Sequence, residues 1–132
     1  MFELTINNKV YNFNFGLGFI RELNPKVTKA IDGVKGKQQE LGLQYAIGGI
    51  IDGDIEDLIN VLLTANKGCE GERLTIKELE AHIEDSNTDL DELFEQVLDF
   101  LSSANCTKKT VKNLQKAIED QKAKTESEQA AK

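Results

Sequence analysis

The 132-residue sequence predicts a single α+β domain that is predominantly helical, with an N-terminal β-hairpin packed on about five helices. Near the N-terminus, apolar and polar residues alternate with the period of two that is typical of β-strands. From residue 41 onward, apolar residues recur at spacings of three and four, as they do in helices that bury one face. A chain of this length suits one domain and can bury a sizeable core.

Two alternating segments at the N-terminus predict the hairpin. Asn7-Asn8 lies between them and predicts a tight turn, because asparagine tolerates a positive φ. A lone two-stranded hairpin is marginal in water, so its apolar side chains must lie against helices. These side chains are Phe2, Leu4, Ile6, Tyr11, Phe13 and Phe15.

A short helix and an irregular segment follow the hairpin. Leu17, Ile20 and Leu23 predict a helix that ends before Pro25, because the residue preceding a proline avoids the helical region. Residues 26–40 are rich in lysine, glutamine and glycine. They predict an exposed loop, with a second short hairpin as the alternative.

Residues 41–68 predict two amphipathic helices joined at Asp52-Gly53-Asp54. Gly53 is placed to end the first helix, and Asp54 is placed to cap the second. Such stripes either form the core of the chain or contact a partner. The first stripe comprises Leu43, Ala46, Ile47, Ile50 and Ile51, and the second comprises Ile55, Leu58, Ile59 and Leu62.

Three further helices are predicted toward the C-terminus. Thr75 and Glu78 form a capping box ahead of a helix that is expected to bury Ile76, Leu79 and Ile83. Asp89 opens the most regular helix, and Thr107 can cap the last one. The stripe of the Asp89 helix comprises Leu90, Leu93, Phe94, Val97, Leu98 and Leu101, and that of the last helix comprises Val111, Leu114, Ala117 and Ile118.

The C-terminal end of the chain has no apolar stripe. From Lys122 the sequence reads KAKTESEQAAK, which is polar throughout. Such a segment is typical of a frayed or disordered tail. The predicted domain therefore covers residues 1–121, and residues 122–132 form the predicted tail.

The charge distribution restricts the class of partner. Residues 1–53 carry a net charge of +1, residues 54–104 carry −11, and residues 105–132 carry +3. Nucleic-acid binding requires lysine and arginine to neutralise phosphates, so the acidic centre argues against it. No apolar run is long enough to span a membrane, and no signal peptide is recognisable. We therefore expect a cytosolic protein with reduced thiols at Cys69 and Cys106.

A search for catalytic and metal-binding patterns supports no enzyme. A calcium loop starting at Asp52 would need glycine where Asp57 stands and glutamate where Leu63 stands. His82 is the single histidine of the sequence, and with two distant cysteines it matches no zinc module. We expect no catalytic residue, metal or cofactor, and an enzyme that uses His82 is the weakest alternative.

The candidate contacts with a partner or a second copy are therefore apolar stripes and a basic cluster. The lysines either solubilise the last helix or form a docking patch for an acidic neighbour, which includes another copy of this chain. The candidates are Ile47, Ile50, Ile51, Phe94, Leu98, Leu101, Lys108, Lys109 and Lys112.

Four segments together carry a family resemblance. They are MFELTINNKVYNFNFGLGFIRELN, IDGVKG, GLQYAIGGIIDGDIEDLINVLLTANKG and DELFEQVLDFLSSANCTKKTVKNL. Over residues 1–118 the sequence resembles tail assembly chaperones of siphovirus-type bacteriophages and prophages of Gram-positive bacteria, which build long non-contractile tails. The pattern rests on apolar spacing and Gly-Asp turns.

The resemblance implies a non-enzymatic protein that needs no cofactor. It would bind the tape measure protein, keep that client soluble and recruit tail tube subunits. It would act in the host bacterial cytoplasm and be absent from the mature virion. A homo-oligomer and a longer form made by ribosomal frameshifting are further expected partners.

One alternative from a different class remains open. The acidic segment of residues 54–104 could belong to an inhibitor or nucleic-acid mimic that occupies a basic groove of a host protein. Such a mimic needs its carboxylates aligned on one exposed face. A chaperone instead needs exposed apolar surface.

Overall fold

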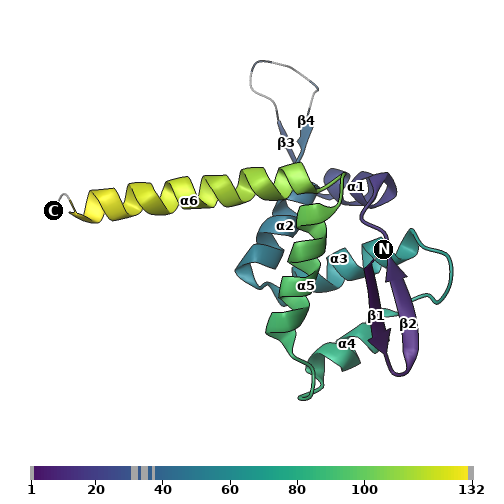
Figure 1. Cartoon of the computed structure of the whole chain (residues 1–132). Coiled ribbons are helices and arrows are strands. Elements are labelled where there is room, and N and C mark those ends of the chain that lie inside the picture. Colours follow the sequence, from purple (N-terminus) through teal and green to yellow (C-terminus); the bar gives the residue numbers. More distant parts are fainter. Residues whose placement is uncertain (1, 31–32, 34–35, 37, 131–132) are drawn as a thin grey trace.

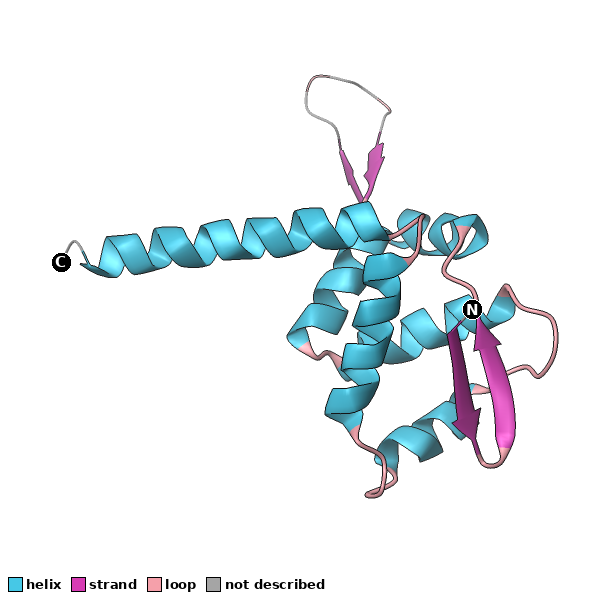
Figure 2. Ribbon diagram, viewed as in Figure 1, coloured by secondary structure: helices cyan, strands magenta, loops and turns pink. Residues whose placement is uncertain are grey.

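A computed structural model describes residues 2–30, 33, 36 and 38–130, and within them it shows two β-hairpins and six α-helices (Figure 1). The α+β class with an N-terminal hairpin on a helical body is confirmed (Figure 2). The elements are β1 (Phe2–Ile6), β2 (Lys9–Phe13), α1 (Leu17–Leu23), the 3₁₀ turn η1 (Asn24–Lys26), β3 (Thr28–Ala30), β4 (Gln38–Glu40), α2 (Gly42–Asp52), α3 (Ile55–Lys67), α4 (Ile76–Glu84), α5 (Leu90–Ser103) and α6 (Lys108–Ala130).

The N-terminal hairpin has the predicted turn. β1 and β2 are antiparallel, with Phe2 opposite Phe13. Asn7 and Asn8 have φ values of 53° and 65°, and two consecutive positive φ values are the signature of a type I′ turn. This turn has the twist of the strands that it joins, so the local sequence sets the register of the hairpin.

Aromatic contacts attach the hairpin to the helices. The ring of Phe2 lies 5.4 Å from that of Phe100 on α5, and the ring of Phe15 lies 5.0 Å from that of Phe19 on α1. Phe2, Phe13, Phe15 and Phe19 are all buried. Offset and edge-to-face pairs of this kind stabilise a core beyond their buried area. The hairpin thus contributes a large share of the aromatic core.

The second hairpin was the alternative for residues 26–40, and the structure confirms it where it is described. β3 pairs with β4 in antiparallel register, with Thr28 opposite Glu40. It projects from the helical body (Figure 1). Most of the IDGVKG segment, residues 31–36, lies outside the described residues.

The joint between α2 and α3 forms as its sequence predicts. Gly53 adopts a left-handed φ of 76° and donates its N–H to the carbonyl of Ile50, while the N–H of Asp54 reaches the carbonyl of Gly49 at 2.8 Å. This pair of bonds is a Schellman motif. The Oδ1 of Asp54 then accepts the N–H of Asp57 at 3.1 Å and caps α3.

Two buried or half-buried polar links hold the hairpin to α3 and α4, and neither was anticipated. The side chain of Asn66 donates to the carbonyls of Asn12 and Glu72 and accepts the N–H of Leu74. The hydroxyl of Tyr11 donates to the carboxylate of Glu78 at 2.5 Å. The bonds from Asn66 to Asn12 and from Tyr11 to Glu78 join segments far apart in the sequence, so no local pattern predicts them.

The predicted caps at Thr75 and Asp89 are confirmed, whereas the side chain of Thr107 makes a different bond from the one expected. Glu78 donates its N–H to the hydroxyl of Thr75, and Glu92 donates its N–H to the carboxylate of Asp89. The buried hydroxyl of Thr107 donates to the carbonyl of Leu101 at 2.6 Å. Thr107 therefore ties the end of α5 to the start of α6.

Two residues expected in the core are exposed instead. Ile55 is 43% exposed and Ile76 is 51% exposed. Each is the first residue of its helix, so it lies before the turns that pack on the body. Leu17, the first residue of α1, is exposed for the same reason. The apolar stripes of α1, α3 and α4 therefore pack on the body from their second position onward.

The last helix is longer than its apolar stripe. α6 continues to Ala130, past Lys122, where a frayed tail was expected, and it projects from the body (Figure 1). Residues 108–130 contain no glycine or proline and are rich in alanine, lysine, glutamate and glutamine, which are strong helix formers. The backbone there is helical, while the domain boundary at residue 121 stays a prediction.

Candidate functional site

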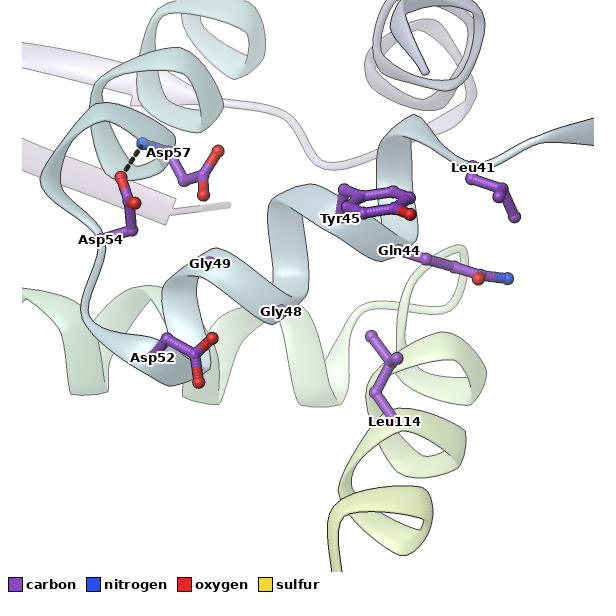
Figure 3. Close-up of a pocket in the computed structure, with 9 residues that line it drawn as sticks. All are labelled: Leu41, Gln44, Tyr45, Gly48, Gly49, Asp52, Asp54, Asp57 and Leu114. Carbon is purple, nitrogen blue, oxygen red and sulfur yellow. Dashed lines mark hydrogen bonds between the residues drawn. The ribbon is translucent and has the colours of Figure 1, made fainter. Parts of the chain in front are cut away.

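A groove on the surface lies between α2, the start of α3 and α6 (Figure 3). Its volume is about 430 Å³. The groove is lined by Leu41, Gln44, Tyr45, Gly48, Gly49, Asp52, Asp54, Asp57 and Leu114. We call it the α2–α6 groove.

One end of the α2–α6 groove is apolar. Tyr45 projects from α2 and is 61% exposed, the largest exposure among the exposed large hydrophobic residues of the described structure. Leu41 and Leu114 are half-buried beside it. An exposed aromatic ring next to leucine side chains is typical of a contact surface, since it offers apolar area together with a polar tip.

The other end of the groove is acidic. Figure 3 shows the carboxylates of Asp52, Asp54 and Asp57 around the joint between α2 and α3. Asp57 is half-buried, and burial raises the pKa of its carboxyl, with a further increase from the nearby Asp54. The negative charge of Asp57 is thus less favourable here than in water, and a cation placed in the groove would stabilise it.

Two adjacent glycines form the floor of the groove, and they face different surroundings. A Cβ on Gly49 would lie 1.8 Å from Oδ2 and 2.6 Å from Cβ of Asp57, so the absence of a side chain lets α3 approach α2. A Cβ on Gly48 would meet no atom within 4 Å. Gly49 therefore serves packing, whereas Gly48 leaves open space at the surface.

A basic surface lies on the other side of α6. Lys108, Lys109, Lys112 and Lys116 are exposed, and we call them the lysine face. Three of them line a second hollow together with Val111. At about 100° of rotation per residue, Lys112 lies about 200° around α6 from Leu114, which lines the α2–α6 groove. The lysine face and the groove therefore flank opposite sides of one helix.

The structure places the nine predicted contact residues in three groups. Ile47, Ile50 and Leu101 have exposed fractions of 0%, 2% and 0% and belong to the core, so their assignment as surface contacts needs correction. Ile51, Phe94 and Leu98 are half-buried at the edge of the core. The three lysines, Lys108, Lys109 and Lys112, are exposed as predicted.

Tyr45 is the groove residue that the sequence pattern missed. It lies off the apolar stripe of α2, on a face that it shares with Gly48, Gly49 and Asp52. An aromatic residue beside two glycines, away from the apolar stripe, was the available signal. To predict that Tyr45 and Leu114 line the same groove, one must know that α2 and α6 pack together.

Other kinds of site find no support in the described residues. His82 is half-buried on α4. In the part of the chain that the structure describes, no group of three or more histidine, cysteine, aspartate or glutamate residues could hold a metal ion. Within the same part, every helix falls short of the length and apolarity needed to cross a bilayer.

A comparison with known families decides the identity at family level. Residues 3–116 match the family described as phage tail assembly chaperone protein, TAC. The chain belongs to this family. The match includes α1–α5, the start of α6 and every residue of the α2–α6 groove. No curated protein and no solved structure matches the chain.

Proposed function

We propose that this tail assembly chaperone acts without catalysis in the host bacterial cytoplasm, where it binds the tape measure protein of a siphovirus-type phage or prophage of a Gram-positive bacterium. It keeps that client soluble, recruits tail tube subunits and is absent from the mature virion. The family match over residues 3–116 carries this proposal. The same match favours a chaperone over the alternative function, an acidic inhibitor of a host protein.

The chemistry of the client suits an apolar stripe on a helix. A long helical protein exposes apolar side chains until the tail tube encloses it, and exposed stripes associate with one another. Leu90, Phe94 and Leu98 recur every fourth residue along α5 and are half-buried at the edge of the core. Helix recognition uses anchors at such spacings. We assign client binding to this α5 stripe.

Self-association is the second part of the proposal. Copies that line up along a client would protect a long stretch of it at once, because each bound copy raises the effective concentration of its neighbours. A longer frameshifted form would join the same assembly through the residues that the two forms share. This form would link the coat to the tail tube subunits.

Co-expression with the adjacent tape measure protein tests the proposal. The client should be found in the soluble fraction with this chain and in aggregates without it. The variant Phe94→Gln/Leu98→Gln should lose this effect, whereas Leu17→Gln/Ile76→Gln, with comparably apolar residues exposed elsewhere, should retain it. The variant His82→Ala should also retain it. A client that is equally soluble with and without the chain would refute the proposal.

A further inference from the structure

The α2–α6 groove and the lysine face are complementary in charge. The groove has three carboxylates at one end and Tyr45 at the other. The lysine face has four exposed ammonium groups, and three of these lysines line a hollow together with the buried Val111. Lysine stems are apolar and can lie along an aromatic ring while the ammonium group reaches a carboxylate. The lysines of one surface could therefore pair with the carboxylates and the aromatic ring of the other.

Geometry prevents one chain from satisfying both surfaces by itself. The groove is lined by Leu114 of α6, and the lysine face lies on the opposite side of the same helix. An α-helix with its side chains is about 10 Å across, so the lysines point away from the groove of their own chain. The matching partner must therefore come from another molecule.

We propose that the α2–α6 groove of one copy binds the lysine face of α6 of the next copy, so that the chaperone assembles head to tail. This inference deepens the self-association in the proposed function and does not depend on the client. The two surfaces lie on opposite sides of α6, so one partner molecule cannot cover both, which makes the contact heterologous. A heterologous contact leaves one free groove and one free lysine face on every dimer, so assembly continues into a ring or an open chain.

The position of Asp57 supports a contact between the groove and a lysine of another copy. Its carboxyl is partly withdrawn from water beside Gly49, and its charge is unfavourable in the free chain. A lysine ammonium group in the groove would supply the missing partner, because opposite charges within a few ångströms favour the ionised form. The acidic end of the groove is thus better suited to an occupied state than to an empty one.

Two charge variants separate the two sides of the contact while sparing the fold. The groove variant, Gln44→Lys/Asp52→Lys, changes two exposed residues and leaves the Asp54 cap intact. The face variant, Lys108→Glu/Lys109→Glu/Lys112→Glu, places carboxylates in the first turns of α6, where the helix dipole favours them. The control variant, Glu80→Lys/Glu84→Lys, alters two exposed residues of α4, at the far end of the body from α6 (Figure 1).

Sedimentation velocity over a wide concentration range gives the readout. The wild-type chain and the control variant should form species heavier than the 14.7 kDa chain, more strongly at low salt, since the Debye length is about 10 Å at 0.1 M. The groove variant and the face variant should each remain monomeric. A wild-type chain that is monomeric at every concentration would overturn the proposal, as would a groove or face variant that still assembles.

An equimolar mixture of the two variants distinguishes a groove-to-face contact from groove-to-groove and face-to-face contacts. The face variant keeps a good groove, and the groove variant keeps a good lysine face. The native groove of the face variant can pair with the native lysine face of the groove variant, so the mixture should form species heavier than either variant alone. The two altered surfaces have also exchanged their charges, so growth beyond a dimer is compatible with the same contact, whereas a mixture that stays monomeric would refute it.

An uncharged change tests the shape of the groove separately. Gly48→Gln fills the open space on the floor and leaves the net charge unchanged. It should weaken assembly at both low and high salt, while its unfolding midpoint stays at or above that of wild type. Client solubility in the co-expression assay is measured alongside. If the groove and face variants assemble normally but lose client protection, the groove holds the client and this inference is wrong, although the proposed function would stand.

Discussion

The pair of adjacent glycines in α2 allows a sharp test of how closely α2 and α3 approach. Alanine in place of glycine stabilises the interior of a helix by about 0.5–1 kcal/mol, because glycine loses more backbone freedom on folding. Gly48 and Gly49 share this term, since they are neighbours in one helix. Any difference between Gly48→Ala and Gly49→Ala must therefore come from what each new Cβ meets.

The structure predicts opposite effects of the two substitutions on the free energy of unfolding. The Cβ at position 48 meets no atom within 4 Å, so Gly48→Ala should gain the full propensity term of about 1 kcal/mol. At position 49 the new Cβ lies 2.6 Å from Cβ of Asp57, whose place is set by the backbone of α3. Ordinary carbon contacts are about 3.5–4 Å, so rotation of the carboxylate alone cannot relieve the clash and the helices must separate by roughly 1 Å.

The net effect follows from these terms. Overpacking of this kind costs about 1–3 kcal/mol, and both helices carry core residues, so we take the upper end. Gly49→Ala should then lose about 2 kcal/mol after the propensity gain. A domain of this size shifts by roughly 3–4 °C per kcal/mol. Thermal unfolding followed by circular dichroism should therefore separate the two midpoints by about 10 °C.

A double substitution checks the assigned cause. Asp57→Gly removes the Cβ that the new alanine meets, so it should reduce the cost of Gly49→Ala when the two are combined, relative to each single change. Equal midpoints for Gly48→Ala and Gly49→Ala would show that α3 does not approach α2 at Gly49. That result would also contradict the close packing of α2 and α3 that forms the floor of the α2–α6 groove.

Three further outcomes follow from the structure. The hydrogen bond from the Tyr11 hydroxyl is the main cause that lowers the pKa of Glu78. A carboxyl whose pKa is lowered by folding contributes stability that is lost as the pH falls through its pKa in the folded protein. Tyr11→Phe should therefore reduce the urea midpoint more at about pH 7 than at about pH 3. Burial, and then Asp54, raise the pKa of Asp57, so its contribution is full in acid and lost as pH rises. Asp57→Asn should accordingly raise the midpoint at about pH 7 and leave it unchanged at about pH 3, and equal shifts at both values would contradict the burial of this carboxyl. Truncation after Lys122 should leave the midpoint unchanged within error, because Val111 and Leu114 at the start of α6 attach that helix to the body; a large decrease would move the domain boundary beyond residue 121.

Local hydrogen bonding explains which features could be predicted from the sequence. The turn at Asn7-Asn8, the left-handed Gly53 and the caps at Asp54, Thr75 and Asp89 all form as expected. Each depends on a residue and neighbours within four positions, so the partners are fixed by chain connectivity. The same reasoning predicted the order of the helices and the α+β class.

Periodicity identified the apolar stripes but not their partners. An apolar stripe predicts that one face of a helix is buried, but it does not show whether that face packs against the same chain or against another molecule. Packing therefore decided that Ile47, Ile50 and Leu101 belong to the core while the first residues of α3 and α4 stay exposed. The helical backbone beyond Lys122 followed from propensity, which the apolar pattern alone did not weigh.

The α2–α6 groove was decided by tertiary structure alone. It exists because Gly49 lets α3 approach α2 and because α6 crosses α2 near Tyr45, so that residues from three helices share one surface. The sequence determined the lysine face, since four lysines at helical spacing lie together on any helix that contains them. It could not place an acidic, aromatic groove across that helix, because the contacts that build the groove join residues far apart in the chain and depend on the packing of whole helices.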